Sequence, residues 1–160
     1  MNVQPIIKSI MSKPDLFLDS NALITGIISD KGAARVLLLL AEAGHISLTI
    51  SEQVIAETER IIAKKQPKAL PSYRTALRNT GLRILPDPTP TEVAFYKGII
   101  QDEDDVPIVV AAMNAATDYL VTFNHRDFVD DPNVAIKSSL RIGTAGEALA
   151  WVRAQIVQSI

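Results

Sequence analysis

Apolar residues along this chain fall into two alternating patterns, short continuous runs and longer stretches in which apolar positions recur every three or four residues. Short runs bounded by turn residues predict β-strands, and the recurring pattern predicts α-helices. The predicted strands cover residues 15–19, 46–50, 82–85 and 119–123, with residues 134–137 as the candidate for a short final strand. The predicted helices cover residues 33–43, 51–65, 71–79, 91–101 and 104–116, with a last helix from residue 144. This alternation predicts an α/β fold with a mostly parallel sheet of about five strands, flanked by helices on both faces.

Turn and capping residues support these boundaries. Ser51 is a good helix N-cap, and Thr144-Ala145-Gly146-Glu147 is a capping box. The strongest loop signal, Pro86-Asp87-Pro88-Thr89-Pro90, separates two halves of one domain. With 160 residues the chain can bury a full core in a single domain, which we assign to residues 15–160, with residues 1–14 as an N-terminal arm.

The composition excludes several classes of protein. The chain has no cysteine, which excludes disulfides, zinc–thiolate sites and thiol redox chemistry. Its net charge of -2 argues against a broad basic face for duplex nucleic acid. The longest apolar stretch, residues 33–41, carries Arg35 and is too short to span a bilayer, and the N-terminus has no uninterrupted signal-peptide core. We therefore expect a cytoplasmic protein without a membrane segment.

Positive charge forms two short local clusters. Arg60, Lys64 and Lys65 form the first, and His125 and Arg126 form the second. The simplest interpretation of either cluster, taken alone, is solvated surface charge.

Six polar residues, most of them acidic, stand at element ends or beside hydrophobic runs. They are Asp19, Glu57, Asp104, Asp105, Asn124 and Asp127. Asp19 and Asn124 fall at the carboxyl ends of predicted strands, where parallel sheets gather their ligands. Carboxylates that converge need a cation, and Mg²⁺ prefers oxygen ligands. The pattern therefore predicts a hard-metal site that activates water or binds phosphate.

Each acidic position also has a simpler interpretation. Glu57 could be an exposed helix acid, and Asp127 could cap a turn. Asp104 and Asp105 could stabilise a helix N-terminus. Asp19 is the hardest to explain in this way, because it follows three apolar residues and precedes two polar ones. Taken together, the positions favour the metal site.

Four segments that contain these residues follow one another in a characteristic order. They are Leu16-Phe17-Leu18-Asp19-Ser20-Asn21-Ala22-Leu23, residues 51–57, Asp102-Glu103-Asp104-Asp105 with the apolar run 108–112, and residues 118–128. In this order they resemble the motifs of the PIN-domain ribonucleases, in particular the bacterial toxin-like members. Each motif alone is weak, whereas four in the right order are specific.

This resemblance implies a PIN-like fold and a Mg²⁺- or Mn²⁺-dependent phosphodiesterase that cleaves single-stranded or structured RNA. Asp19, Glu57 and Asp105 correspond to the core acids of the metal site. Asn124 stands at the fourth catalytic position, where many relatives have aspartate, and its amide oxygen could ligate or position water without adding charge. Asp104 could share the metal with Asp105, and Asp127 could compensate for Asn124.

The resemblance also suggests supporting residues and partners. Ser20, Asn21 and Thr122 would orient the acids through hydrogen bonds, and His125 and Arg126 would contact the substrate. Many bacterial members are toxins paired with an antitoxin, and many form homodimers. The leucine run at residues 37–40 is expected to serve as core and as a partner surface.

Two other functions compete with the ribonuclease. A non-catalytic PIN-like module could capture basic partner residues in an acidic pocket, and the amide at Asn124 keeps this alternative open. A receiver-like signalling domain also has an acidic Mg²⁺ pocket, but it would carry an acid pair at its first strand and a lysine after its last.

Overall fold

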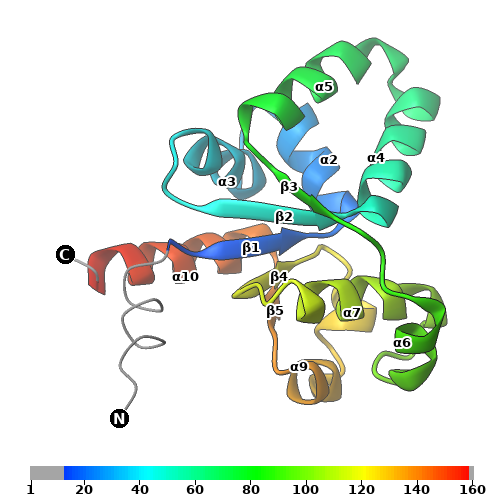
Figure 1. Ribbon diagram of the computed structural model, residues 1–160. Coiled ribbons are helices and arrows are strands. Elements are labelled where there is room, and N and C mark those ends of the chain that lie inside the picture. Colours follow the sequence, from blue (N-terminus) through cyan, green and yellow to red (C-terminus); the bar gives the residue numbers. More distant parts are fainter. Residues whose placement is uncertain (1–12, 159–160) are drawn as a thin grey trace.

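A computed structural model of the protein describes residues 13–158, which form a five-stranded, entirely parallel sheet with helices on both faces (Figure 1). The strands are β1 (Asp15–Leu18), β2 (Ser47–Ser51), β3 (Arg83–Leu85), β4 (Tyr119–Val121) and β5 (Arg141–Gly143). Their spatial order is β3-β2-β1-β4-β5. The predicted α/β class is confirmed. The N-terminal arm, apart from its last two residues, lies outside the described residues.

The helices separate into two groups around the sheet (Figure 1). One group contains α2 (Ser20–Ile28), α3 (Ala33–Glu42), α4 (Glu52–Lys65) and α5 (Leu70–Asn79), with the 3₁₀ turn η1 (Pro67–Ala69). The other contains α6 (Pro90–Phe95), α7 (Val106–Asn114) and α9 (Pro132–Ser138), with the 3₁₀ turn η2 (Glu103–Asp105) before α7. The short α8 (His125–Phe128) follows β4, and α10 (Ala145–Gln158) packs against α3, β4 and β5.

Strand β1 lies in the middle of the sheet and marks its topological switch point. The chain leaves β1 toward β2 on one side and later returns to β4 on the other. Parallel sheets bind their ligands in the crevice that such a reversal opens at the carboxyl ends of the strands. The order also excludes the receiver-like alternative, whose strands run 2-1-3-4-5.

The predicted final strand at residues 134–137 is wrong, because these residues lie in α9. Asp131 caps this helix by accepting a hydrogen bond from the backbone N–H of Asn133 at 3.0 Å, and Pro132 opens it. Val134 and Ser138 are buried one helical turn apart, which is helix periodicity. The true last strand, β5, is Arg141-Ile142-Gly143, and its single apolar residue forms no run that marks a strand in the sequence.

Other boundaries also differ from the predictions. Helix α2 was not predicted, although Asp19 is its N-cap and three polar residues, Asp19, Ser20 and Asn21, separate its apolar positions from those of β1. The helix predicted for residues 91–101 ends at Phe95, and Gly98 then adopts a positive φ of 88° that turns the chain. The helix predicted from residue 104 begins at Val106, after η2.

The core lies on both faces of the sheet, and α2 packs closely on α3. A Cβ on Gly26 would come within 2.9 Å of Leu38 Cδ1 and 3.0 Å of the Ala34 carbonyl oxygen, so a side chain is excluded there. Leu37 and Leu38 are buried, whereas Leu39 is 46% exposed. Within residues 13–158, no helix combines the length and apolar character needed to cross a bilayer.

Candidate metal centre

Asp19 lies at the junction of β1 and α2, at the carboxyl edge of the sheet. Its backbone N–H donates to the Val121 carbonyl at 2.9 Å, which keeps it in register with β4. Its side chain caps α2 by accepting from the Ser20 backbone N–H at 2.8 Å. The carboxylate is only 7% exposed, and this burial raises its pKa, with a smaller increase from the charge of Glu57. The hydrogen bonds that it accepts act in the opposite direction, so Asp19 is a fixed and partly desolvated carboxylate.

Thr122 connects this carboxylate to the segment after β4. The Thr122 hydroxyl is fully buried and donates to Asp19 Oδ2 at 3.0 Å, while it accepts from the Asn124 backbone N–H at 3.1 Å. Asn21 adds a second connection, because its Oδ1 accepts from the Phe123 backbone N–H at 3.1 Å. Of the three predicted supporting residues, Thr122 therefore contacts an acid through its side chain, Ser20 through its backbone, and Asn21 braces the adjacent loop.

Three carboxylates from two separate segments meet beside this junction. One oxygen each of Asp102, Asp105 and Asp127 lies within 4.8 Å of the others. Asp105 precedes α7 but makes no side-chain capping hydrogen bond, so its carboxylate is not occupied by the helix terminus. Asp102 stands three residues earlier, at the start of η2, and accepts from the Asp104 backbone N–H at 3.0 Å. We call these three residues the carboxylate triad.

Among the acids of the centre, Asp105 has the most strongly raised pKa. Burial raises its pKa, and the charges of nearby acids raise it further, to about 7. These acids, in decreasing order of effect, are Asp102, Asp19, Asp127 and Glu57. Charges act at this strength only when they lie close together. Acids from four separate regions of the sequence therefore converge around Asp105.

Asn124 is positioned differently from a free fourth ligand. Its Oδ1 accepts from the Asp127 backbone N–H at 3.3 Å and caps α8. Its Nδ2 donates to Asp127 Oδ2 at 2.9 Å. The amide of Asn124 thus holds the Asp127 carboxylate, and Asp127 rather than Asn124 contributes an oxygen to the triad.

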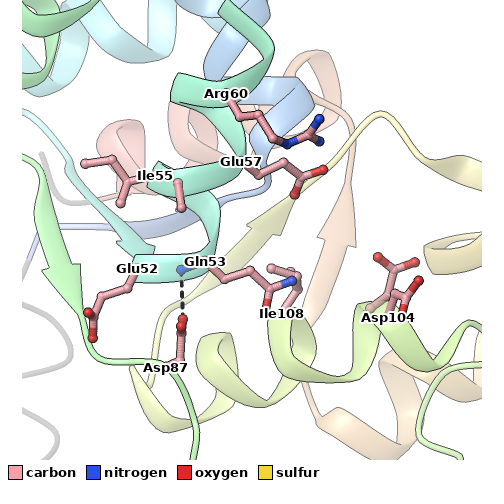
Figure 2. Close-up of a pocket in the computed structure, with 10 residues that line it drawn as sticks. Glu52, Gln53, Ile55, Glu57, Arg60, Asp87, Asp104 and Ile108 are labelled. Atoms are coloured by element: carbon pink, nitrogen blue, oxygen red, sulfur yellow. Dashed lines mark hydrogen bonds between the residues drawn. The ribbon is translucent and has the colours of Figure 1, made fainter. Parts of the chain in front are cut away.

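Glu57 and Asp104 line a hollow of about 720 Å³ that opens beside Asp105. Figure 2 shows Glu57 projecting from α4 and Asp104 lying on the other side, next to the start of α7. Asp87, on the loop before α6, also lines the hollow and accepts a hydrogen bond from the Gln53 backbone N–H at 2.8 Å (Figure 2). Asp104 is exposed and is not one of the three triad carboxylates.

Asp102 is the one triad residue that the sequence did not single out. Its spacing of three residues from Asp105 was the available signal, because residues three apart lie on the same side of a 3₁₀ turn. The two predicted substrate residues, His125 and Arg126, are exposed at the start of α8. The Nε2 atom of His125 lies 4.0 Å from Glu147 Oε1.

The donor set of the triad suits a hard divalent cation. All candidate ligand atoms are carboxylate oxygens, which Mg²⁺ and Mn²⁺ prefer. Three side chains already place one oxygen each within 4.8 Å of the other two, so the same ion is within reach of all three. The raised pKa of Asp105 adds a second reason, since a cation would relieve the repulsion that causes it.

Comparison with known proteins agrees with the fold described above. The sequence model of the PIN domain matches residues 15–126. No curated protein sequence matches the chain. One similar solved structure is VapBC2 from Rickettsia felis bound to a DNA fragment from its promoter, with a TM-score of 0.58 and 23% identity over 81% of this chain and 98% of the other. Another is PAE2754 from Pyrobaculum aerophilum, with a TM-score of 0.58 and 19% identity over 88% of this chain and 90% of the other.

Proposed function

Because this chain belongs to the PIN-domain family, we propose that it is a metal-dependent endoribonuclease that cleaves phosphodiester bonds of RNA. The observation that supports this proposal best is the convergence of four acids on the half-buried Asp105. An acidic crevice of this kind repels RNA unless it holds cations. Its position at the switch point of the sheet is typical of a reaction site.

The residues of the centre divide into ligands and orienting groups. Asp102, Asp105 and Asp127 would hold Mg²⁺ or Mn²⁺, and Asp19 and Glu57 would bind water molecules around it. The bound ion would supply charge neutralisation for the phosphate and an acidified water. Thr122 keeps the Asp19 carboxylate in one orientation, and Asn124 does the same for Asp127. The exposed His125 and Arg126 would contact RNA phosphates.

We also propose a cognate antitoxin as the protein partner, which would make this chain the toxin of a toxin–antitoxin pair. The likeness to VapBC2 of Rickettsia felis, seen on a promoter fragment, supports this setting. The alternative, a non-catalytic PIN-like module, would bind a partner but would not cleave RNA. Only an RNA cleavage assay therefore distinguishes it from the proposed ribonuclease.

The purified protein is expected to cleave single-stranded RNA in Mg²⁺ or Mn²⁺ and to lose this activity in EDTA. Asp19→Asn should remove most of the activity, because it deletes a fixed negative charge from the centre while retaining hydrogen bonds that cap α2. Gel analysis of end-labelled RNA measures the cleavage, and circular dichroism checks the fold of the variant. If Asp19→Asn cleaves at the parental rate, the proposed centre is wrong. If no RNA is cleaved by a folded parent that binds its partner, the non-catalytic module is correct.

A homodimer is the second assembly that we propose. The exposed Leu39 on α3 is the part of the leucine run that remains available, since Leu37 and Leu38 are already buried. Light scattering at micromolar concentration should give twice the mass of 17.4 kDa. Leu39→Glu should then shift the protein toward monomer, whereas a monomeric parent would end this prediction.

A further inference from the structure

Helix α4 carries three cations on the turns that follow Glu57. Arg60, Lys64 and Lys65 are all exposed, and none of the ion pairs among residues 13–158 involves them. The absence of pairing is unexpected for Arg60, because it lies one helical turn from Glu57 and lines the same hollow as Glu57 and Asp105. Figure 2 shows Arg60 and Glu57 next to each other on α4, with both side chains extending from the helix toward the side on which Asp104 lies.

The three cations and Glu57 share one side of α4. Successive residues of a helix are about 100° apart around its axis, which places Arg60 roughly 60° and Lys64 roughly 20° to one side of Glu57, and Lys65 roughly 80° to the other. Along the axis the three cations lie about 4.5 to 12 Å beyond Glu57. A second hollow of about 400 Å³ lies on the opposite flank, lined by Lys65, Glu57, Ser20 and Asn21. Glu57 therefore belongs to both hollows, and each hollow has one of these cations in its wall.

Helix stability explains only part of this cluster. Lys64 and Lys65 lie in the last turn of α4, where cations interact favourably with the helix dipole. Arg60 lies before that turn, among acids with which it forms no ion pair. A guanidinium in this position remains available for an external anion, and its planar donors suit a phosphate.

We propose that Arg60, Lys64 and Lys65 form a phosphate-binding face on α4 that holds the backbone of single-stranded RNA next to the acidic centre. The inference rests on the proposed ribonuclease function and names the surface by which the substrate is held. A positive surface of this kind tracks the backbone without reading the bases. It also answers an electrostatic difficulty, because the protein has a net charge of -2 and must attract a polyanion to an acidic crevice.

The test measures binding separately from cleavage. Fluorescence anisotropy would follow a labelled single-stranded RNA of randomised sequence, about 16 nucleotides long, in EDTA, over a series of KCl concentrations. The variant is R60Q/K64Q/K65Q, and the control is R78Q/K137Q/R153Q, which makes the same change of net charge at exposed positions on α5, α9 and α10. Thermal melting of both proteins establishes that they are folded.

The parent should lose affinity with salt more steeply than the α4 variant. Each single-strand phosphate contact adds about 0.7 to the slope of log K against log[salt], so three contacts should make a difference of about 2, or roughly 20-fold in Kd between about 50 and 200 mM KCl. The control variant should keep the parental slope. Any of three results would overturn the proposal. The parent and the α4 variant could show the same salt slope, the α4 variant and the control variant could lose the same RNA affinity, or the parent could fail to bind the RNA. A binding difference without any metal-dependent cleavage would keep the phosphate-binding face and reject the nuclease.

Discussion

Replacing Asp105 by asparagine is expected to lower kcat/KM for RNA cleavage by about 10²–10³-fold, the loss typical of removing one preorganised electrostatic group. Asp105 is the residue on which the other acids converge, and its carboxylate belongs to the triad. The amide removes the negative charge but keeps the size of the side chain. The measurement is the initial rate of cleavage of a labelled single-stranded RNA at saturating Mn²⁺, with the RNA concentration below KM.

The neighbouring acids provide matched controls for this effect. Asp102→Asn removes a triad carboxylate and should reduce cleavage by at least about tenfold, as loss of a group that tunes a metal site does. Asp104→Asn makes the same chemical change two residues away, at an exposed position outside the triad, and should stay within about twofold of the parent. A loss for Asp104→Asn as large as that for Asp105→Asn would show that the triad has been assigned to the wrong residues.

Without metal, the protein is expected to become less stable as the pH rises from about 4 to about 7, and Asp105→Asn is expected to be more stable than the parent at pH 8. The folded-state pKa of Asp105 is raised from the usual value near 3.8 to about 7. A carboxyl with a raised pKa binds its proton more tightly in the folded state, so its stabilising contribution is present at low pH. That contribution is lost as the pH rises through the folded-state pKa. Asp19, whose pKa is also raised, acts in the same direction.

Melting curves recorded with EDTA and with Mn²⁺ at several pH values measure this effect. Mn²⁺ at about 100 times its Kd should stabilise the parent by roughly 2.7 kcal/mol, and each kcal/mol should raise Tm by roughly 2–4 °C. Asp105→Asn should melt higher than the parent in EDTA at pH 8 and respond less to Mn²⁺. The exposed Asp104→Asn serves as the control for charge alone. A parent that ignores Mn²⁺, together with an Asp105→Asn protein that is destabilised in EDTA, would contradict a clustered metal site.

Local signals in the sequence were enough for the elements that position the acids. The apolar runs before Asp19 and Asn124 predicted β1 and β4, and Ser51 predicted the start of α4, which carries Glu57. Each signal is confined to a few residues, because strand burial and helix capping are decided by near neighbours. The same locality explains the failure at β5, because its single apolar residue, Ile142, forms no run. Helix α2 did carry a local signal, its cap residue Asp19.

Which acids come together in the centre depends on tertiary contacts, and no local sequence pattern indicates these contacts. Asp102 and Asp104 are equally acidic neighbours of Asp105, yet only Asp102 contributes to the triad. Their separation is decided by the 3₁₀ turn of η2, in which residues three apart, such as Asp102 and Asp105, lie on the same side and Asp104 lies about a third of a turn away from Asp105. Asn124 and Asp127 were similarly ambiguous until the cap of α8 joined the amide of one to the carboxylate of the other.

The sequence by itself determined the family of the chain, the order of its first four strands and most of its helices, and most of the acids near the carboxyl edge of the sheet, because periodicity and order are written along the chain. Only the tertiary structure decided which of these acids share one point and which residues hold them. The hydrogen bond from Thr122 to Asp19 joins residues 103 positions apart, and it exists because β1 and β4 are adjacent strands. The raised pKa of Asp105 is likewise a property of the packed fold, since it arises from burial and from charges that other segments bring close.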